Sequence, residues 1–262
     1  MVNMVHSGNR KMNVGIIGCT GMVGQRFATL LENHPWFTVT ALAASPRSAG
    51  KTYAEAVGKR WVMENPLPPS MRDMVVKDAS KVEEIAGDVD FVFCAVDMPK
   101  ADIRALEEAY AKAECPVVSN NSAHRSTPDV PMVIPELNPG HLQIIPFQRA
   151  RLGTRRGFIS VKSNCSLQSY VPALFPLSKW GVSKALVCTY QAISGAGKTF
   201  ASWPEMVDNV IPYIGGEEEK SEQEPLKIWG KIENGAIVPA ASPAFTPFTK
   251  MIVLYFGNTI SG

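Results

Sequence analysis

Apolar residues in the first part of the chain fall into short continuous runs that are separated by stretches with helical spacing. The runs predict β-strands at residues 12–17, 38–43, 90–96 and 117–119. Between the last two strands, the spacing of apolar residues over Lys100–Lys112 predicts a helix. Strands that alternate with helices indicate an α/β fold with a doubly wound parallel sheet.

A glycine-rich turn, residues 18–24 (GCTGMVG), follows the first predicted strand and leads into a helical pattern. Glycines allow a tight turn and a close approach of the backbone to a phosphate, whose charge is stabilised by the amino end of a helix. The spacing is GxxGxxG and not the commoner GxGxxG, so a plain turn stays an alternative. Its place between a strand and a helix favours a dinucleotide-binding turn.

The end of the second predicted strand indicates which nicotinamide cofactor fits. An acidic residue there would accept a hydrogen bond from the ribose 2′-OH of NAD, whereas arginine and hydroxyl groups suit the 2′-phosphate of NADP. The segment that follows, AASPRSAGK, holds no acid but contains Ser45, Arg47, Ser48 and Lys51. We therefore expect NADP. The alternative is that Arg47 and Lys51 are solvated on a surface loop.

Cys165 stands among small polar residues in the run 161–168 (VKSNCSLQ). Residues such as Asn164 favour helix N-caps and turns, and apolar residues after Cys165 recur at helical spacing. A thiol at the amino end of a helix meets a positive potential, which favours the nucleophilic thiolate. A buried structural thiol is the alternative; it fits Cys94 and Cys188 better, because both lie inside apolar, strand-like runs.

Composition narrows the classes of function. The chain has 262 residues, 45% hydrophobic and 19% charged, which suits one large globular domain or two of ordinary size. Its net charge of +2 gives no electrostatic reason to expect nucleic acid or a membrane surface as partner. Five scattered cysteines argue against a disulfide framework and a zinc site, and no run resembles a signal peptide or a membrane span. We expect a cytoplasmic protein with residues 1–11 as a loose leader.

Five motifs stand in a characteristic order: the glycine turn, then ASPRSAGK, SNNSAHR, SNCSLQS and QAISGAGK. With them the chain resembles the aspartate-semialdehyde dehydrogenases of archaea, fungi and some bacteria, over about residues 12–243. The resemblance implies an NADP-binding Rossmann-type domain over 12–146. It also implies an α+β catalytic and dimerisation domain over 147–243, like that of glyceraldehyde-phosphate dehydrogenases, whose sheet would begin near Gly157. A homodimer or tetramer is implied as well.

The family's reaction implies roles for several side chains. It interconverts aspartyl phosphate and aspartate semialdehyde with NADP, on the way to lysine, methionine and threonine. Cys165 would attack the acyl phosphate and form a thioester, which hydride from NADPH reduces. Arg125 would bind phosphate, while Asn164 and Gln191 would surround the substrate beside Cys165.

Two further contacts with the substrate are implied by the run Glu217-Glu218-Glu219-Lys220. Glu218 would bind the substrate amino group and Lys220 the phosphate, in a register that is open by one residue. A solvated row of charges is the alternative. No metal is expected, and His124 and His141 are expected to be loop histidines whose hydrogen bonds are satisfied.

The resemblance also implies cofactor contacts in both parts of the chain. The residues expected to meet NADP are Gly18, Thr20, Gly21, Met22, Val23, Gly24, Ser45, Arg47, Ser48, Ala95, Ser194, Gly195 and Gly197.

The last part of the sequence departs from the family's pattern. All four histidines precede Cys165, whereas the family carries a downstream arginine for the substrate and an acid/base histidine. Residues 244–262 do not resemble the family. We therefore expect a catalytic domain that is incomplete at its C-terminus, a foreign tail and impaired activity. The alternatives are an enzyme like N-acetylglutamyl-phosphate reductase, or a catalytically dead fragment that binds NADP or a partner.

Overall fold

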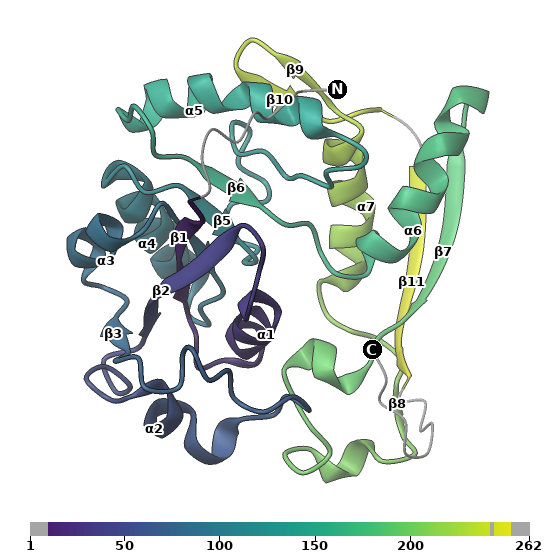
Figure 1. Ribbon diagram of the computed structural model, residues 1–262. Helices are drawn as coiled ribbons and strands as arrows, with labels where there is room; N and C mark the ends of the chain where they lie inside the picture. The colour runs from purple at the N-terminus through teal and green to yellow at the C-terminus, as the bar shows by residue number, and fades with distance from the viewer. Residues whose placement is uncertain (1–9, 242–243, 253–262) are drawn as a thin grey trace. The chain divides into compact units, whose positions relative to one another are not determined.

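The computed structural model describes residues 10–241 and 244–252, so most of the expected leader and residues 253–262 of the expected tail lie outside it. The chain forms two compact units (Figure 1). The first comprises residues up to His124 together with Ile145–Val161, and the second comprises Arg125–Ile144 and the residues from Lys162 onward. The units therefore do not divide at the single boundary expected near residue 146, because the chain crosses between them three times.

The first unit is built on a six-stranded sheet in the order β3-β2-β1-β4-β5-β6. Its strands are β1 (Met12–Ile17), β2 (Phe37–Ala44), β3 (Lys77–Asp78), β4 (Phe91–Cys94), β5 (Val117–Ser119) and β6 (Ile159–Val161). All five pairings are parallel, which confirms the predicted doubly wound sheet. The central strand β1 is buried from Val14 to Ile17, as expected for a strand covered on both faces.

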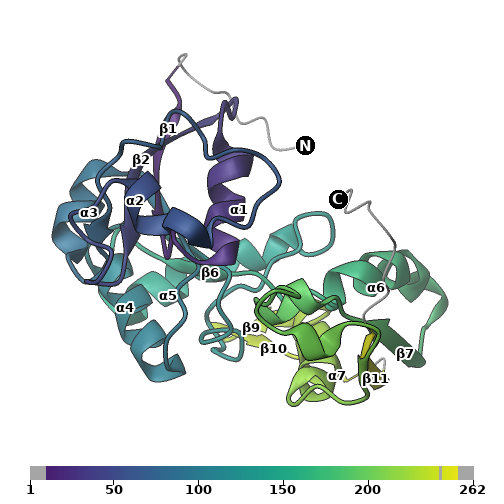
Figure 2. The same cartoon turned by 90° about the horizontal axis from the view of Figure 1, so that it is seen from below.

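Helices cover both faces of this sheet. They are α1 (Met22–Leu31), α2 (Tyr53–Val57), α3 (Val82–Asp88), α4 (Lys100–Lys112) and α5 (Ile145–Leu152), with the 3-10 turn η1 (Gly58–Arg60) after α2. Helix α1 lies on one side of the sheet, and α3 and α4 lie on the other (Figures 1 and 2). The turn between β1 and α1 therefore opens at the carboxyl edge of the sheet, where doubly wound folds bind ligands.

Strand β6 corrects one expectation, because the segment near Gly157 does not begin the second sheet. It pairs in parallel with β5 as the edge strand of the first. Gly157 permits this, since a Cβ there would lie 1.7 Å from the carbonyl oxygen of Ala111 in α4. The Glu114 carboxylate then holds the entry to the strand by accepting hydrogen bonds from the backbone N–H groups of Arg155, Arg156 and Gly157, at 2.5–3.1 Å.

The described residues of the second unit form a three-stranded sheet, a hairpin and two helices. Its strands are β7 (Lys184–Tyr190), β8 (Val210–Ile211), β9 (Lys231–Glu233), β10 (Ala236–Val238) and β11 (Ala244–Ile252). Its helices are α6 (Leu167–Leu174) and α7 (Glu217–Ile228), with 3-10 turns η2 (Pro139–Ile144), η3 (Phe175–Trp180), η4 (Ile193–Ala196) and η5 (Pro204–Met206). The sheet order is β7-β11-β8, so part of the stretch expected to be a foreign tail is its central strand. Helix α7 contacts β11.

Strand β7 leaves most of its side chains exposed. Val187 is buried, whereas Leu186 is 75% exposed. Cys188, expected to be buried in an apolar strand, is exposed as well. The expectation was wrong because one face of this strand is uncovered, while Cys94 in the covered strand β4 is buried as predicted.

The bonds to Glu114 give a test of the fold through pH. They lower the pKa of Glu114 from its ordinary value of 4.5 to about 2. A carboxyl with a lowered folded-state pKa stabilises the fold fully above its unfolded-state value, and the contribution is lost as the pH falls through the folded-state value. We therefore expect Glu114→Gln to lower the urea midpoint of unfolding at neutral pH. The difference from wild type should shrink between pH 4.5 and about 2.

The exposed Glu83 supplies the control for this measurement. Glu83→Gln should change the urea midpoint little at any pH. A Glu114→Gln deficit of the same size at neutral and at acid pH would show that the carboxylate charge is not what holds the loop.

Candidate functional site

The glycine turn of the first unit has its shape because two of its glycines meet backbone atoms. Gly18 has φ +90°, and a Cβ there would lie 2.4 Å from the Ala95 carbonyl oxygen. A Cβ on Gly24 would lie 2.2 Å from the Gly18 carbonyl oxygen, whereas the nearest atom to a Cβ on Gly21 would be 3.6 Å away. Gly21 is the N-cap of α1 and supplies no capping side chain. The N–H groups of the first turn, at Met22 and beyond, thus face the turn without acceptors inside the helix, as an anion site requires.

Two buried side chains fasten this turn to the segment that follows β2. Gln25 of α1 donates a hydrogen bond to the Thr20 carbonyl at 3.0 Å and another to the Arg60 carbonyl at 2.8 Å. The Tyr53 hydroxyl donates to the Cys19 carbonyl at 2.8 Å. The position of Arg60 relative to the glycine turn is therefore fixed by direct bonds. Sequence reasoning missed both side chains, because neither belongs to a recognisable motif.

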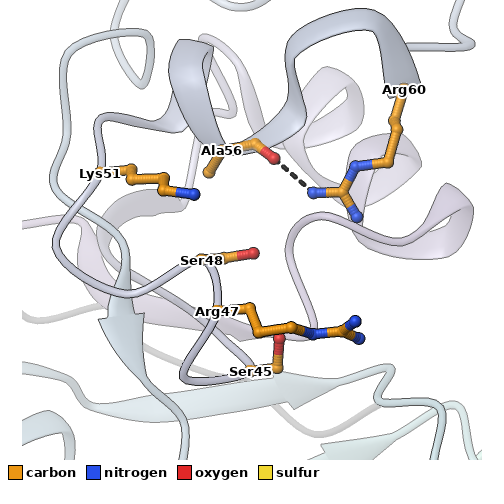
Figure 3. A pocket seen from close by; sticks show the side chains of 6 residues that line it. All are labelled: Ser45, Arg47, Ser48, Lys51, Ala56 and Arg60. Carbon is orange, nitrogen blue, oxygen red and sulfur yellow. Dashed lines mark hydrogen bonds between the residues drawn. The ribbon is translucent and has the colours of Figure 1, made fainter.

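A cationic pocket of about 240 Å³ lies beside β2 (Figure 3). It is lined by Ser45, Arg47, Ser48, Lys51, Ala56 and Arg60. Lys51 and Ser48 point into it from one side and the Arg60 guanidinium from the other, where it is hydrogen-bonded to the Ala56 carbonyl. Three cations and two hydroxyl groups around one small space suit a doubly charged phosphate. The expected Ser45, Arg47 and Ser48 thus share one pocket, and Arg60 is an addition to them.

In the second unit Cys165 is exposed while the two residues before it are buried. It directly precedes Ser166, the N-cap of α6, which agrees with the predicted place at a helix amino end. The Asn164 side chain shapes the loop, since its Oδ1 accepts hydrogen bonds from the Ser166 N–H at 2.9 Å and from its hydroxyl at 2.7 Å. The thiol is therefore presented on a loop whose base is anchored.

One face of α7 supplies the acidic and basic groups that surround this loop. Its buried polar residues are Glu217, Ser221, Glu224 and Lys227, which recur at helical spacing. Glu217 accepts a hydrogen bond from the Asn164 side-chain amide at 2.9 Å and pairs with Lys220 at 2.6 Å. Glu217, the residue of the charge run that meets Asn164, is one position before Glu218, the expected ligand of the substrate amino group.

Glu224 joins the SNNSAHR and SNCSLQS motifs. One of its carboxylate oxygens pairs with the Arg125 guanidinium at 3.1 Å, and the other accepts the Asn164 backbone N–H at 2.6 Å. Both side chains of the ion pair are about nine-tenths buried, at 11% and 9% exposed. Arg125, implied in phosphate binding, and Asn164, implied beside the substrate, are therefore bonded to one carboxylate. Glu224 was not among the sequence candidates.

Two lysines complete this cluster, and sequence reasoning named neither. The buried Lys227 ammonium donates to the carbonyls of Arg125, Thr127 and Val130 at 2.7–2.8 Å, and burial lowers its pKa to about 8. Lys162 donates to the Ser163 carbonyl at 3.2 Å. Burial also lowers the pKa of Lys162, against the opposing charge of Cys165. Lys162 therefore lies close enough to Cys165 for the two charges to interact.

The expected Gln191 follows β7 and lies against the glycine loop after it. A Cβ on Gly195 would lie 2.4 Å from the Gln191 side-chain nitrogen, so a side chain there would displace Gln191. Ser194 and Gly195 belong to η4, and Gly197 adopts φ +68° where that turn ends. These candidates lie in the second unit, whereas the other cofactor candidates lie in the first.

Two histidines of the described chain, His124 and His141, are buried. The His141 ring is bonded to Asn138 at 3.1 Å and to the Gly230 carbonyl at 3.0 Å. Within the described part of the chain, no three histidine, cysteine or acidic side chains are grouped so that they could hold a metal ion. No helix among the described residues is long and apolar enough to cross a membrane.

Comparisons with protein families match both units. Residues 13–145 match the family described as semialdehyde dehydrogenase, NAD binding domain, and residues 174–253 match semialdehyde dehydrogenase, dimerisation domain. The second match extends through β11.

Individual relatives agree with this. The aspartate-semialdehyde dehydrogenase of Methanothermobacter thermautotrophicus is 43% identical over 88% of this chain, which spans 64% of that protein. The enzyme of the same name from Archaeoglobus fulgidus is 43% identical over 95% of the chain and 70% of that protein. Among solved structures, aspartate semialdehyde dehydrogenase with NADP from Candida albicans has a TM-score of 0.81 at 33% identity, covering 94% of this chain and 68% of that one.

The glycine geometry predicts effects of different size for the same substitution at two positions. Gly24→Ala should destabilise the protein by about 1–3 kcal/mol, because its methyl group would overlap backbone atoms. Gly21→Ala, which meets no such atom, should change the free energy of unfolding by less than about 0.5 kcal/mol. Urea unfolding of both variants tests this. Similar losses from the two would refute the assigned roles of these glycines.

Proposed function

Because this chain belongs to the aspartate-semialdehyde dehydrogenase family, we propose that it takes part in the NADP-dependent interconversion of aspartyl phosphate and aspartate semialdehyde. The strongest support is the Glu224 carboxylate, which is bonded both to Arg125 and to the loop that presents the exposed Cys165. A nucleophile beside a phosphate-binding guanidinium is the arrangement that acyl-phosphate chemistry needs.

The chemistry of the reductive direction follows from these side chains. The Cys165 thiolate attacks the acyl carbon of aspartyl phosphate, a carbon–sulfur bond forms, and the bond to the phosphate oxygen breaks. Arg125 receives the departing phosphate. NADPH, when bound, supplies the hydride that reduces the thioester, after which the aldehyde separates and Cys165 is free again. Sulfur suits both steps, because it is a good nucleophile and a good leaving group.

The cofactor proposal is NADP. The cationic pocket would hold the ribose 2′-phosphate, and the amino end of α1 beyond Gly21 would hold the pyrophosphate. The similar Candida albicans structure was solved with NADP. Ala95, which contacts Gly18, and the loop with Ser194, Gly195 and Gly197 would lie toward the nicotinamide.

The substrate's own groups would be bound from α7. Glu217 is our proposal for the ligand of the substrate amino group, in place of Glu218, and Lys220 for a ligand of phosphate. The pair is already joined at 2.6 Å in this structure. Gln191 would orient the substrate beside Cys165. A similar solved protein, aspartate semialdehyde dehydrogenase II of Vibrio cholerae, was obtained complexed with ASA.

A homodimer, or a tetramer built from it, would cover the open face of β7. The match to a dimerisation domain includes this strand. Leu186 and Tyr190 are 75% and 60% exposed there, and contiguous exposed apolar surface of this kind marks interaction sites.

Proton transfer is the step for which this chain offers least. A placed acid/base contributes about 10²- to 10⁴-fold in rate, and no histidine follows Cys165 in residues 1–262. We therefore expect residues 1–262 by themselves to turn over more slowly than the archaeal and fungal relatives. We also propose that the first part of the chain binds NADP and that the part after it serves catalysis and dimerisation.

Arg60 gives a test of cofactor choice. Removing a charged hydrogen-bond donor to phosphate costs about 1.5–3 kcal/mol, so Arg60→Ala should weaken NADPH binding about 10- to 100-fold. The dissociation constant of NADH, which lacks the 2′-phosphate, should change less than about threefold. Fluorescence titration measures both, and Lys59→Ala, an exposed neighbour outside the pocket lining, is the matched control. Equal weakening of the two cofactors would contradict the assignment of the pocket.

Cys165 gives a test of the reaction. Purified residues 1–262 should form more than one NADPH per chain from aspartate semialdehyde only when NADP and inorganic phosphate are both present. Cys165→Ser should lose about 10³-fold or more in rate, while Cys188→Ser, the other exposed thiol, should retain it. Faster oxidation of N-acetylglutamate semialdehyde would favour the related reductase, and NADP binding without oxidation of either aldehyde would favour a binding fragment.

A further inference from the structure

Neither phosphate binding by Arg125 nor nucleophilic attack by Cys165 by itself requires a glutamate at position 224. It is buried on α7, yet both of its oxygens are bonded to other segments, one to Arg125 and the other to the backbone of Asn164. A buried carboxylate is costly unless it is paired in this way. Its two bonds link the Arg125 guanidinium to Asn164, the residue next to Cys165.

We infer that Glu224 is a positioning residue that sets where the Arg125 guanidinium lies relative to the Cys165 loop. This inference rests on the proposed function, in which Arg125 receives the phosphate that Cys165 displaces. A guanidinium has five N–H donors, more than one carboxylate accepts, so the ion pair can orient Arg125 and still let it bind phosphate.

The neighbouring bonds restrict this role to the Arg125 side chain. Lys227, one turn further along α7, holds the Arg125 carbonyl at 2.7 Å and so fixes the backbone there independently of Glu224. Glu217 holds the Asn164 side chain at 2.9 Å and so keeps the cysteine loop in place. Loss of Glu224 should therefore release the guanidinium while the loop and the backbone around Arg125 stay fixed.

Glu224→Gln is the sharpest change. The variant keeps the volume of the side chain but has one acceptor oxygen in place of two, and its amide N–H₂ would face a donor. It therefore cannot serve Arg125 and the Asn164 N–H at once. Glu222→Gln, on the exposed face of the same helix, is the matched control.

The readout is protection of the Cys165 thiol by inorganic phosphate. Iodoacetamide alkylates exposed thiols, and peptide mass spectrometry separates Cys165 from Cys188, whose rate is an internal control. In wild type, phosphate bound at Arg125 should slow alkylation of Cys165 and leave Cys188 unchanged. Glu224→Gln should raise the half-protecting phosphate concentration about tenfold, and Glu222→Gln should not change it.

A double variant separates positioning from mere stabilisation. If Glu224 acts through Arg125, Glu224→Gln should add nothing to the loss caused by Arg125→Ala. Glu224→Asp, which keeps the charge on a shorter side chain, serves if the glutamine variant does not fold. It should shift the half-protecting concentration in the same direction.

Three results would overturn the inference: equal protection of wild type and variant, additive losses in the double variant, or no protection of Cys165 in wild type. Oxidation of aspartate semialdehyde by wild type is measured separately. Its absence while phosphate protection follows the expected pattern would defeat the proposed function and leave the role of Glu224 standing.

Discussion

The second unit depends on buried charges along one face of α7 that are ion-paired or hydrogen-bonded. Glu217, Glu224 and Lys227 are buried there, and each is bonded to a segment from which the proposed chemistry draws a residue. Breaking a buried pair of this kind typically costs about 3–5 kcal/mol, because one charge is left without a partner. Helix α7 thus holds the SNNSAHR and SNCSLQS motifs at a fixed separation. The residues next to Cys165 are anchored, while the Cys165 side chain itself is exposed.

In the first unit, backbone geometry and not buried charge fixes the arrangement of the glycine turn. Gly18 and Gly24 let β1 and α1 meet so closely that the amino end of α1 points at the carboxyl edge of the sheet. Gln25 and Tyr53 then tie this turn to the segment that carries Arg60. A single rigid frame therefore includes both the anion site of the helix and the cationic pocket beside β2. These are the two features that a dinucleotide with an extra phosphate would use.

Local patterns predicted much of the first unit, because its information lies in neighbouring residues. The apolar run at 12–17 and the amphipathic spacing over Lys100–Lys112 match β1 and α4, and the glycine turn lies where its composition placed it. β6 was assigned to the wrong sheet, since pairing with β5 depends on the contact of Gly157 with Ala111 and on Glu114, which are remote in sequence.

The candidate site likewise combines residues that local motifs identified with residues that only the fold brings together. Cys165, Asn164 and Arg125 could be named because they lie in motifs, whereas Glu224 could not. Its partners, Arg125 and Asn164, lie 99 and 60 residues away from it along the chain. Arg60 is similar, since only the folded chain brings it to the pocket of Arg47. The exposure of Cys188 was missed because an apolar strand looks the same in sequence whether its face meets a core or another surface.

The central claim is that Cys165 carries the acyl group, and intact-protein and peptide mass spectrometry tests it most directly. The chain is incubated with aspartate semialdehyde and NADP while phosphate is withheld, so that the thioester has no phosphate to accept its acyl group. If Cys165 carries the acyl group, we expect an added mass equal to an aspartyl group on the peptide that contains Cys165. This mass should be lost when phosphate is supplied. No adduct, or an adduct on Cys188 that phosphate does not remove, would contradict it.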